Sequence, residues 1–148
     1  MRILALGGSG GMGRFSSFAI SAFQNISKVT IADLNENDAV EFANNFDDRF
    51  IGTGLDVSDI VKLEKVMKDH DVIMNTTGPF FKYGVSILKS AIKCKCHYFD
   101  ICDDWEPTIE MLKLSDEAFK NDVTAIIGLG ASPGISNLLG LKAINELD

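Results

Sequence analysis

The stretch Gly8-Ser9-Gly10-Gly11-Met12-Gly13 fits the pattern G-x-G-x-x-G and follows a short apolar run from Arg2 to Leu6. The run predicts a buried strand, and the apolar residues beyond the glycines recur at the spacing of a helix. Between a strand and a helix, this pattern is typical of a turn that binds a dinucleotide. Gly8 permits the tight turn, Gly10 lets the main chain approach a pyrophosphate, and Gly13 lets the helix pack closely on the sheet. The free N–H groups at the start of the helix would hold the phosphates.

Asp33 ends the second predicted strand, 20 positions after Gly13. An acidic residue at this place accepts hydrogen bonds from ribose hydroxyls and repels a 2′-phosphate. The adjoining Leu34 and Asn35 supply no arginine that would hold such a phosphate. We therefore expect NAD as the cofactor, with NADP as the alternative. A turn aspartate that precedes Asn35 is the competing interpretation.

Short apolar segments that predict strands alternate along the chain with segments of helical periodicity. The predicted strands cover residues 2–6, 28–32, 50–57, 72–76, 97–102 and 123–129. Such alternation with short connections predicts an α/β fold. We expect a three-layer, doubly wound parallel sheet of about six strands with helices on both faces, which is the Rossmann fold.

Apolar spacing and capping residues predict three details of the helices. The first helix is expected to face the core with Met12, Phe15, Phe18, Ala19, Ala22, Phe23 and Ile26. Ser58 is expected to cap the third helix, whose predicted apolar face comprises Ile60, Val61, Val66 and Met67. Pro107 is expected to open one helix that carries Ile109, Leu112, Ala118 and Phe119.

Polar residues and glycines gather where the predicted strands end. In a parallel sheet these carboxyl ends share one edge, and open α/β sheets bind ligands along that edge. Asp56 has two equally weighted interpretations there, as a contact to the adenine amino group or as a residue that merely precedes a helix. The residues expected at this edge are Asp33, Asp56, Val57, Thr76, Thr77, Gly78, Pro79, 100–104 and 130–134.

Length and composition exclude several classes of protein. The 148 residues amount to one domain, and 46% hydrophobic with 24% charged residues exclude a disordered chain. A formal charge of −7 makes nucleic acid an unexpected partner. No apolar run reaches the ~20 residues of a membrane span, so no membrane partner is expected. Three cysteines without a signal peptide favour the reducing cytoplasm. Their spacing with His97 matches no familiar zinc site, so no metal is expected.

The glycines also fit Gly7-x-x-Gly10-x-x-Gly13, a spacing that resembles the short-chain dehydrogenases. Those enzymes carry a Tyr-x-x-x-Lys pair. In this chain Ile87 stands four positions after Tyr83, and Cys102 stands four positions after Tyr98. The pair is absent from the sequence, which rejects this interpretation.

Three longer segments resemble the saccharopine dehydrogenase-like family, which includes saccharopine reductases and lysine 6-dehydrogenases. They are Asn75-Thr76-Thr77-Gly78-Pro79-Phe80, the run His97-Tyr98-Phe99-Asp100-Ile101-Cys102-Asp103-Asp104-Trp105-Glu106-Pro107, and Gly128-Leu129-Gly130-Ala131-Ser132-Pro133-Gly134. The resemblance spans essentially the whole chain and corresponds to the nucleotide-binding half of the family. It implies that residues 1–134 form an NAD(P)-binding Rossmann domain and that residues 135–148 form a helix leading to a substrate domain absent from this chain. It further implies pyrophosphate at Gly8–Gly13, adenosine ribose at Asp33–Asn35 and nicotinamide at Thr76–Pro79.

The function implied by the resemblance is a nicotinamide-dependent oxidoreductase that acts on the C–N bond of an amino acid or imine. Its substrate would be a small amino-acid molecule, and any homodimer would form through the missing domain. Asp103 could stabilise a cationic imine, and Lys82 and Tyr83 are nearby groups able to transfer protons. Phe80 and Ser132 replace a tyrosine and an acid common in saccharopine reductases, which puts saccharopine itself in doubt as the substrate. The alternative function is a non-catalytic NAD(P)-binding redox sensor.

Overall fold

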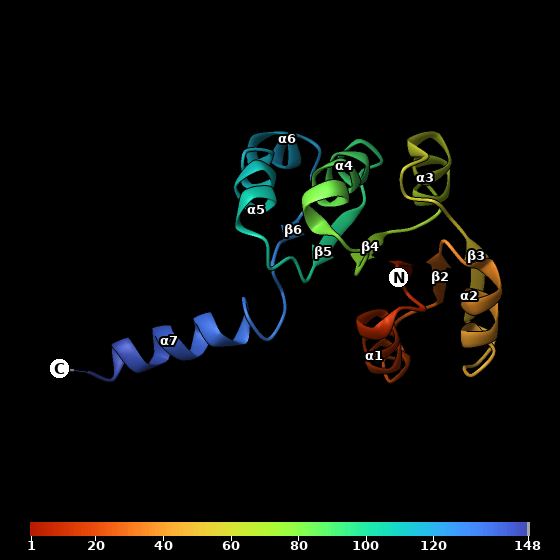
Figure 1. Cartoon of the computed structure of the whole chain (residues 1–148), viewed down its shortest axis with the longest axis horizontal. Coiled ribbons are helices and arrows are strands. Elements are labelled where there is room, and N and C mark those ends of the chain that lie inside the picture. Colours follow the sequence, from red (N-terminus) through yellow and green to blue (C-terminus); the bar gives the residue numbers. More distant parts are fainter. Residues whose placement is uncertain (148) are drawn as a thin grey trace.

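Six strands form one parallel sheet in the order β3-β2-β1-β4-β5-β6, as seen in a computed structural model that describes residues 1–147 (Figure 1). The strands are β1 (Arg2–Leu6), β2 (Lys28–Asp33), β3 (Phe50–Gly54), β4 (Val72–Asn75), β5 (His97–Asp100) and β6 (Ala125–Ile126). The order reverses between β1 and β4, so the two halves of the sheet wind in opposite directions from that point. The predicted doubly wound Rossmann fold is confirmed.

Helices lie on both faces of this sheet, and two separate cores result. The helices are α1 (Gly11–Ser21), α2 (Glu36–Ala43), α3 (Ile60–Met67), α4 (Phe80–Lys93), α5 (Trp105–Leu112), α6 (Ser115–Lys120) and α7 (Ile135–Asn145). Because side chains alternate along a strand, Ile3 and Ala5 of β1 pack in the core with residues of α1 and α2. Leu4 and Leu6 enter the other core, with residues of α3 to α6.

The predicted inward face of α1 is wrong. Its buried residues are Gly13, Ser17 and Ile20. Phe15 is 74% exposed, and Met12, Phe18, Ala19, Ala22 and Phe23 are exposed as well, whereas Ile26 beyond the helix is buried. The physical reason is the close approach of α1 to the sheet: a helix that touches the main chain of the preceding turn must present its smallest residues there, which rotates the large apolar side chains outward.

Two predicted helix boundaries and the ends of three predicted strands also differ from the structure. β5 ends at Asp100 and not at residue 102, and β6 covers only Ala125–Ile126 of the predicted 123–129. Asp59 caps α3 by accepting a hydrogen bond from Lys62 N (3.1 Å), because the Ser58 hydroxyl donates instead to Asp56 (2.7 Å). β3 ends at Gly54 and does not extend to residues 56 and 57. The helix expected from Pro107 is divided into α5 and α6 by a turn at Leu114, whose N–H donates to Met111 O (3.0 Å).

The predicted apolar faces of α3 and of the α5–α6 segment are correct only in part. Met67 of α3 is buried as expected, together with Leu63, while Val61 is 79% exposed. In α6, Ala118 is buried and the adjacent Phe119 is exposed. Both segments carry apolar residues on more than one side, so apolar spacing identified their buried side only in part.

α7 projects away from the other elements in Figure 1. None of its residues is buried. Its start is tied to the loop after β6, because Ile135 N donates to Gly130 O (3.0 Å) and Ser136 N donates to Ala131 O (3.0 Å). Among residues 1–147, no helix is long and apolar enough to cross a membrane.

Candidate functional site

The turn between β1 and α1 is built on two glycines that make close contacts with the main chain. Gly7 adopts a left-handed φ of 67°, and a Cβ there would lie 3.0 Å from Thr76 C and Thr77 N. The left-handed position in this turn is therefore Gly7. Gly8 lacks room for a different reason, since a Cβ would lie 2.8 Å from Ala5 O. At Gly13 a Cβ would clash with the Gly7 carbonyl oxygen, in keeping with the predicted close packing of helix on turn.

The first turn of α1 offers main-chain donors. Gly10 is the N-cap residue, and no side chain caps the helix. The N–H groups of Gly11, Met12 and Gly13 lie in this first turn, where a helix supplies no carbonyl partner. A Cβ at Gly11 would have no atom within 4 Å, so the space beside this turn is open. Such a cradle of uncapped amides suits an anionic diphosphate.

Asp33 is bound to this turn. Its Oδ2 accepts hydrogen bonds from Ser9 Oγ (2.8 Å) and Ser9 N (3.3 Å), and its Oδ1 accepts from Leu34 N (2.8 Å). Each carboxylate oxygen has further lone pairs, so these contacts orient the group and leave it able to accept bonds from a ligand. Arg14 reaches the same turn, because its Nε donates to Ser9 O (2.7 Å) while its guanidinium lies over the Phe42 ring. Sequence reasoning missed Arg14, although its place in the first turn of the helix was visible.

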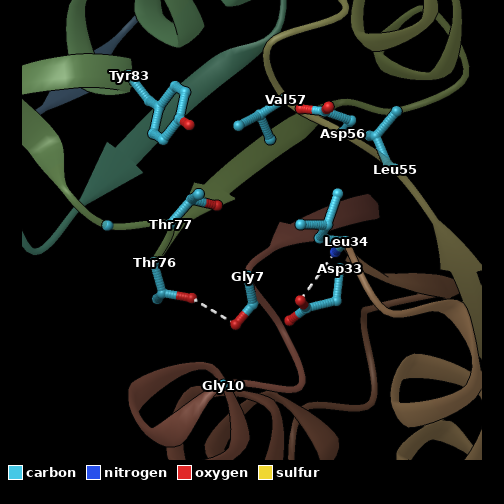
Figure 2. A pocket seen from close by; sticks show the side chains of 11 residues that line it. Gly7, Gly10, Asp33, Leu34, Leu55, Asp56, Val57, Thr76, Thr77 and Tyr83 are labelled. Atoms are coloured by element: carbon cyan, nitrogen blue, oxygen red, sulfur yellow. Dashed lines mark hydrogen bonds between the residues drawn. The ribbon is translucent and has the colours of Figure 1, made fainter.

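A cavity of about 320 Å³ opens beside this turn, where the strand order reverses. In Figure 2, Asp33, Leu34, Leu55 and Asp56 line one side, and Thr76, Thr77 and Tyr83 line the other. The full lining is Gly7, Gly10, Asp33, Leu34, Leu55, Asp56, Val57, Thr76, Thr77, Gly78 and Tyr83. The position agrees with the rule that open α/β sheets bind ligands at such a reversal.

The loop after β4 is fastened to the turn after β1. Thr76 Oγ1 donates to Leu6 O (2.9 Å) and lies 3.1 Å from Gly7 O (Figure 2). Thr77 N donates to Asn75 Oδ1 (3.0 Å). Thr77 Oγ1 is buried and has no hydrogen-bond partner among residues 1–147. An unpartnered buried hydroxyl costs folding free energy, and a ligand bound against this wall could supply the missing partner.

Eight of the fifteen predicted cofactor residues line the cavity, and seven do not. Asp33, Leu34, Asp56, Val57, Thr76, Thr77, Gly78 and Gly10 line it. Gly8, Ser9, Gly11, Met12, Gly13, Asn35 and Pro79 are not part of the lining. Asn35 caps α2 by accepting from Asn37 N (3.1 Å), and Asp56 Oδ1 accepts from Ser58 N (2.8 Å). These Ser58 contacts lower the pKa of Asp56.

The three proton-transfer candidates are not brought together. Tyr83 lines the cavity, whereas Lys82 and Asp103 do not. Lys82 Nζ lies 4.8 Å from the centroid of the Tyr83 ring. The Tyr83 phenol and, to a smaller extent, the Asp56 carboxylate raise the pKa of Lys82. A general base needs a pKa near the working pH, so this shift makes Lys82 a poorer base.

Cysteine and histidine lie away from the cavity. Cys96 Sγ points to the Met67 and His70 carbonyl oxygens (3.3 Å each), and burial raises the pKa of its thiol to about 11. His70 Nε2 lies 2.8 Å from Thr30 Oγ1 in the core. Among residues 1–147, no three His, Cys, Asp or Glu side chains are grouped in a way that could hold a metal ion.

Comparison with known proteins identifies a family for this chain. The family model described as "Saccharopine dehydrogenase NADP binding domain" matches residues 3–126. Two curated relatives, from Schizosaccharomyces pombe and Saccharomyces cerevisiae, are named "Saccharopine dehydrogenase [NADP(+), L-glutamate-forming]". Each is 30% identical over 93 residues, which cover 63% of this chain and 20% of the relative. The chain thus spans about a fifth of their length.

A solved structure supports the match over a longer stretch. The apo histidine-tagged saccharopine dehydrogenase (L-Glu forming) from Saccharomyces cerevisiae superimposes with a TM-score of 0.83 and 28% sequence identity. The superposition covers 98% of this chain and 31% of that one. With a parallel sheet, an uncapped glycine turn and a family match over most of its length, this chain belongs to the family of saccharopine dehydrogenase NADP-binding domains.

Proposed function

We propose that this chain is the nicotinamide-nucleotide-binding part of a dehydrogenase that acts on the C–N bond of an amino acid or imine. The observation that carries the proposal is the uncapped first turn of α1, which opens on a cavity lined by Asp33 and Thr77. The turn has the donors for a diphosphate, Asp33 has acceptors for ribose hydroxyls, and Thr77 has a buried hydroxyl without a partner. When bound, the nucleotide would supply the hydride chemistry, and these residues would orient it.

We further propose that the chain prefers NAD(H), although its relatives are named for NADP(+). The Asp33 carboxylate is fixed by Ser9 and Leu34, so it cannot easily turn away from a 2′-phosphate. Arg14 is the cation closest to this turn along the chain, and its guanidinium is held over the Phe42 ring while its Nε donates to Ser9 O. A fixed negative charge beside the ribose disfavours a further phosphate.

Equilibrium titration with NADH and NADPH, followed by their fluorescence, tests both proposals. We expect NADH to bind at least about tenfold more tightly, since a hydrogen bond to a charged group contributes roughly 1.5–3 kcal/mol. The isosteric Asp33→Asn should weaken NADH binding and strengthen NADPH binding. Arg14→Gln is the matched control, because it changes a charge at the same turn and should not reverse the preference.

The outcomes separate the two proposals. If the unchanged chain binds NADPH more tightly than NADH, and Asp33→Asn does not alter this preference, the proposed NAD preference is refuted. The proposed dinucleotide site would still stand. Failure of the chain to bind either nucleotide would refute the site itself.

For the chemical step we propose Tyr83 as the proton-transfer group, since it lines the cavity and Lys82 and Asp103 do not. The substrate would be a small amino acid or imine held partly by residues outside this chain. We also propose that the protein works in the cytoplasm, because Cys94, Cys96 and Cys102 are free thiols.

A further inference from the structure

Three buried polar residues lie in β4 and β5, and two of them, Asn75 and Asp100, end these strands. Asn75 pairs with Asp100 in the register of the sheet, and Tyr98 lies opposite Ile73. None of the three exposes more than 1% of its surface. Burying an amide, a phenol and a carboxylate together costs free energy unless each polar atom finds a partner.

The three side chains form one directed series of hydrogen bonds. Tyr98 Oη donates to Asp100 Oδ2 (2.7 Å) and accepts from Asn75 Nδ2 (3.0 Å). Asn75 Oδ1 then accepts from Thr77 N (3.0 Å). Desolvation raises the pKa of Tyr98 well above its ordinary value, so the phenol stays protonated and remains a donor. The series ends on the main chain of Thr77, which lines the cavity.

The other carboxylate oxygen of Asp100 holds a second loop. Asp100 Oδ1 accepts from Gly128 N (2.8 Å) and from Cys102 N (3.1 Å). The main-chain oxygen of Asp100 also accepts from Leu129 N (2.7 Å). One fully buried side chain is thereby bonded both to the network behind the cavity wall and to the loop that leads from β6 to α7.

We infer that Asp100 is a positioning residue that orients the nicotinamide wall of the cavity, acting through Tyr98 and Asn75 on Thr77. The inference rests on the proposed function, because it takes this wall to face the nicotinamide half of the nucleotide. A carboxylate only accepts hydrogen bonds, so Tyr98 must donate to it. The Tyr98 oxygen is then free to accept from the Asn75 amide nitrogen, which turns the Asn75 carbonyl oxygen toward Thr77 N.

Replacing the carboxylate by an amide of the same shape disturbs this order. In Asp100→Asn one acceptor oxygen becomes a donor nitrogen. If the nitrogen faces Tyr98, the phenol loses its acceptor. If the nitrogen faces Gly128 N and Cys102 N instead, these two N–H donors lose their acceptor and lie against another donor. In the first arrangement the Asn75 amide gains by turning its oxygen to Tyr98, and Thr77 N then loses its acceptor.

The test compares a whole nucleotide with the part that lacks nicotinamide. The 148-residue chain, Asp100→Asn and Tyr98→Phe are titrated with NADH and with ADP-ribose. We expect each variant to bind NADH about tenfold more weakly, and ADP-ribose within about twofold of the unchanged chain. The fluorescence of bound NADH should also shift in the variants, since it reports the surroundings of the nicotinamide ring.

Thr30→Val is the matched control. It removes another buried hydroxyl, one that contacts His70 Nε2 (2.8 Å) and does not line the cavity. We expect it to lower stability about as much as Tyr98→Phe and to leave the ratio of NADH to ADP-ribose affinity unchanged. Tyr98→Phe decides the matter if Asp100→Asn does not fold.

Equal losses for both ligands in Tyr98→Phe, or no loss at all, would overturn the positioning role and leave the proposed function standing. Absence of binding by the unchanged chain would instead overturn the proposed function.

Discussion

Gly13 lies against the Gly7 carbonyl oxygen, with no space for a methyl group between them. We expect Gly13→Ala to lower the free energy of unfolding by about 1–3 kcal/mol, because overpacking forces the helix away from the turn. NADH binding should weaken in parallel, since the same shift moves the first-turn amides. Urea unfolding and NADH titration measure the two effects.

Gly11→Ala is the control for stability at the residue scale. A Cβ at Gly11 would meet no atom within 4 Å, so this substitution should change the free energy of unfolding by less than about 0.5 kcal/mol. Equal destabilisation of Gly13→Ala and Gly11→Ala would mean that the loss of a glycine, and not contact with the Gly7 carbonyl oxygen, lowers the free energy of unfolding.

Single residues that stand in a local pattern were predictable, and residues joined across the fold were not. Asp33 follows the glycine pattern at a fixed spacing, and it does line the cavity. The pattern that begins at Gly8 did not indicate the left-handed φ of Gly7. The network of Asn75, Tyr98 and Asp100 joins two strands, and no spacing in one sequence indicates which buried polar groups pair.

At the scale of elements, α1 shows where apolar periodicity fails. Many apolar residues recur around this helix, so the pattern alone cannot decide which side is buried. The side chosen in the structure carries Gly13 and Ser17, which small size alone would have indicated. The same argument applies to α3, where two apolar sides compete.

From the observed orientation of α1 we expect the opposite effects on stability from those that its apolar periodicity predicts. Ile20→Ala should lower the free energy of unfolding by about 2–4 kcal/mol, because Ile20 is buried. Phe15→Ala should change it by less than about 0.5 kcal/mol in spite of its larger side chain. Chemical unfolding of both variants measures the difference, and a larger loss for Phe15→Ala would contradict the packing of α1.

The contact between β2 and the end of α3 should respond to pH. Burial lowers the pKa of His70 below its ordinary value of 6.5, and neutral His70 bonds to Thr30 and Val66. The unfolded chain takes up a proton as pH falls through 6.5, while the folded chain resists it. This contribution to stability is therefore complete above that pH and is lost as pH falls below it.

Urea unfolding between about pH 7.5 and pH 5.5 measures this loss. His70→Gln should flatten the dependence, because the group that titrates in this window is removed. Asp71 does not obscure the comparison, since Arg2 lowers its pKa below 3.8. An unchanged slope in His70→Gln would show that another group is responsible.

At the scale of the whole molecule, the predicted division near residue 134 can be tested by removing α7. None of the residues of α7 is buried. We expect a chain ending at residue 134 to unfold within about 0.5 kcal/mol of the 148-residue chain and to bind NADH equally well. A marked loss of either property would mean that α7 belongs to the nucleotide-binding domain.

The match to each curated relative covers 20% of that relative. We expect the 148-residue chain to bind NADH and to show no turnover with lysine, saccharopine or related imines. Titration with NADH measures binding, and the absorbance of NADH followed over time measures turnover. Robust turnover would mean that the residues described here suffice for the reaction.

Gly128 and Gly134 stand at the two ends of the connection between the sheet and α7, and both adopt left-handed φ angles. The first is clamped by the Asp100 carboxylate, whereas the second begins a helix with no buried residue. Gly134 is held as well, because it forms a bridge with Gly130 and the following Ile135 N donates to Gly130 O (3.0 Å). The connection between the sheet and α7 is therefore bonded at both ends, and at Gly128 it shares the Asp100 carboxylate with the network behind the cavity wall.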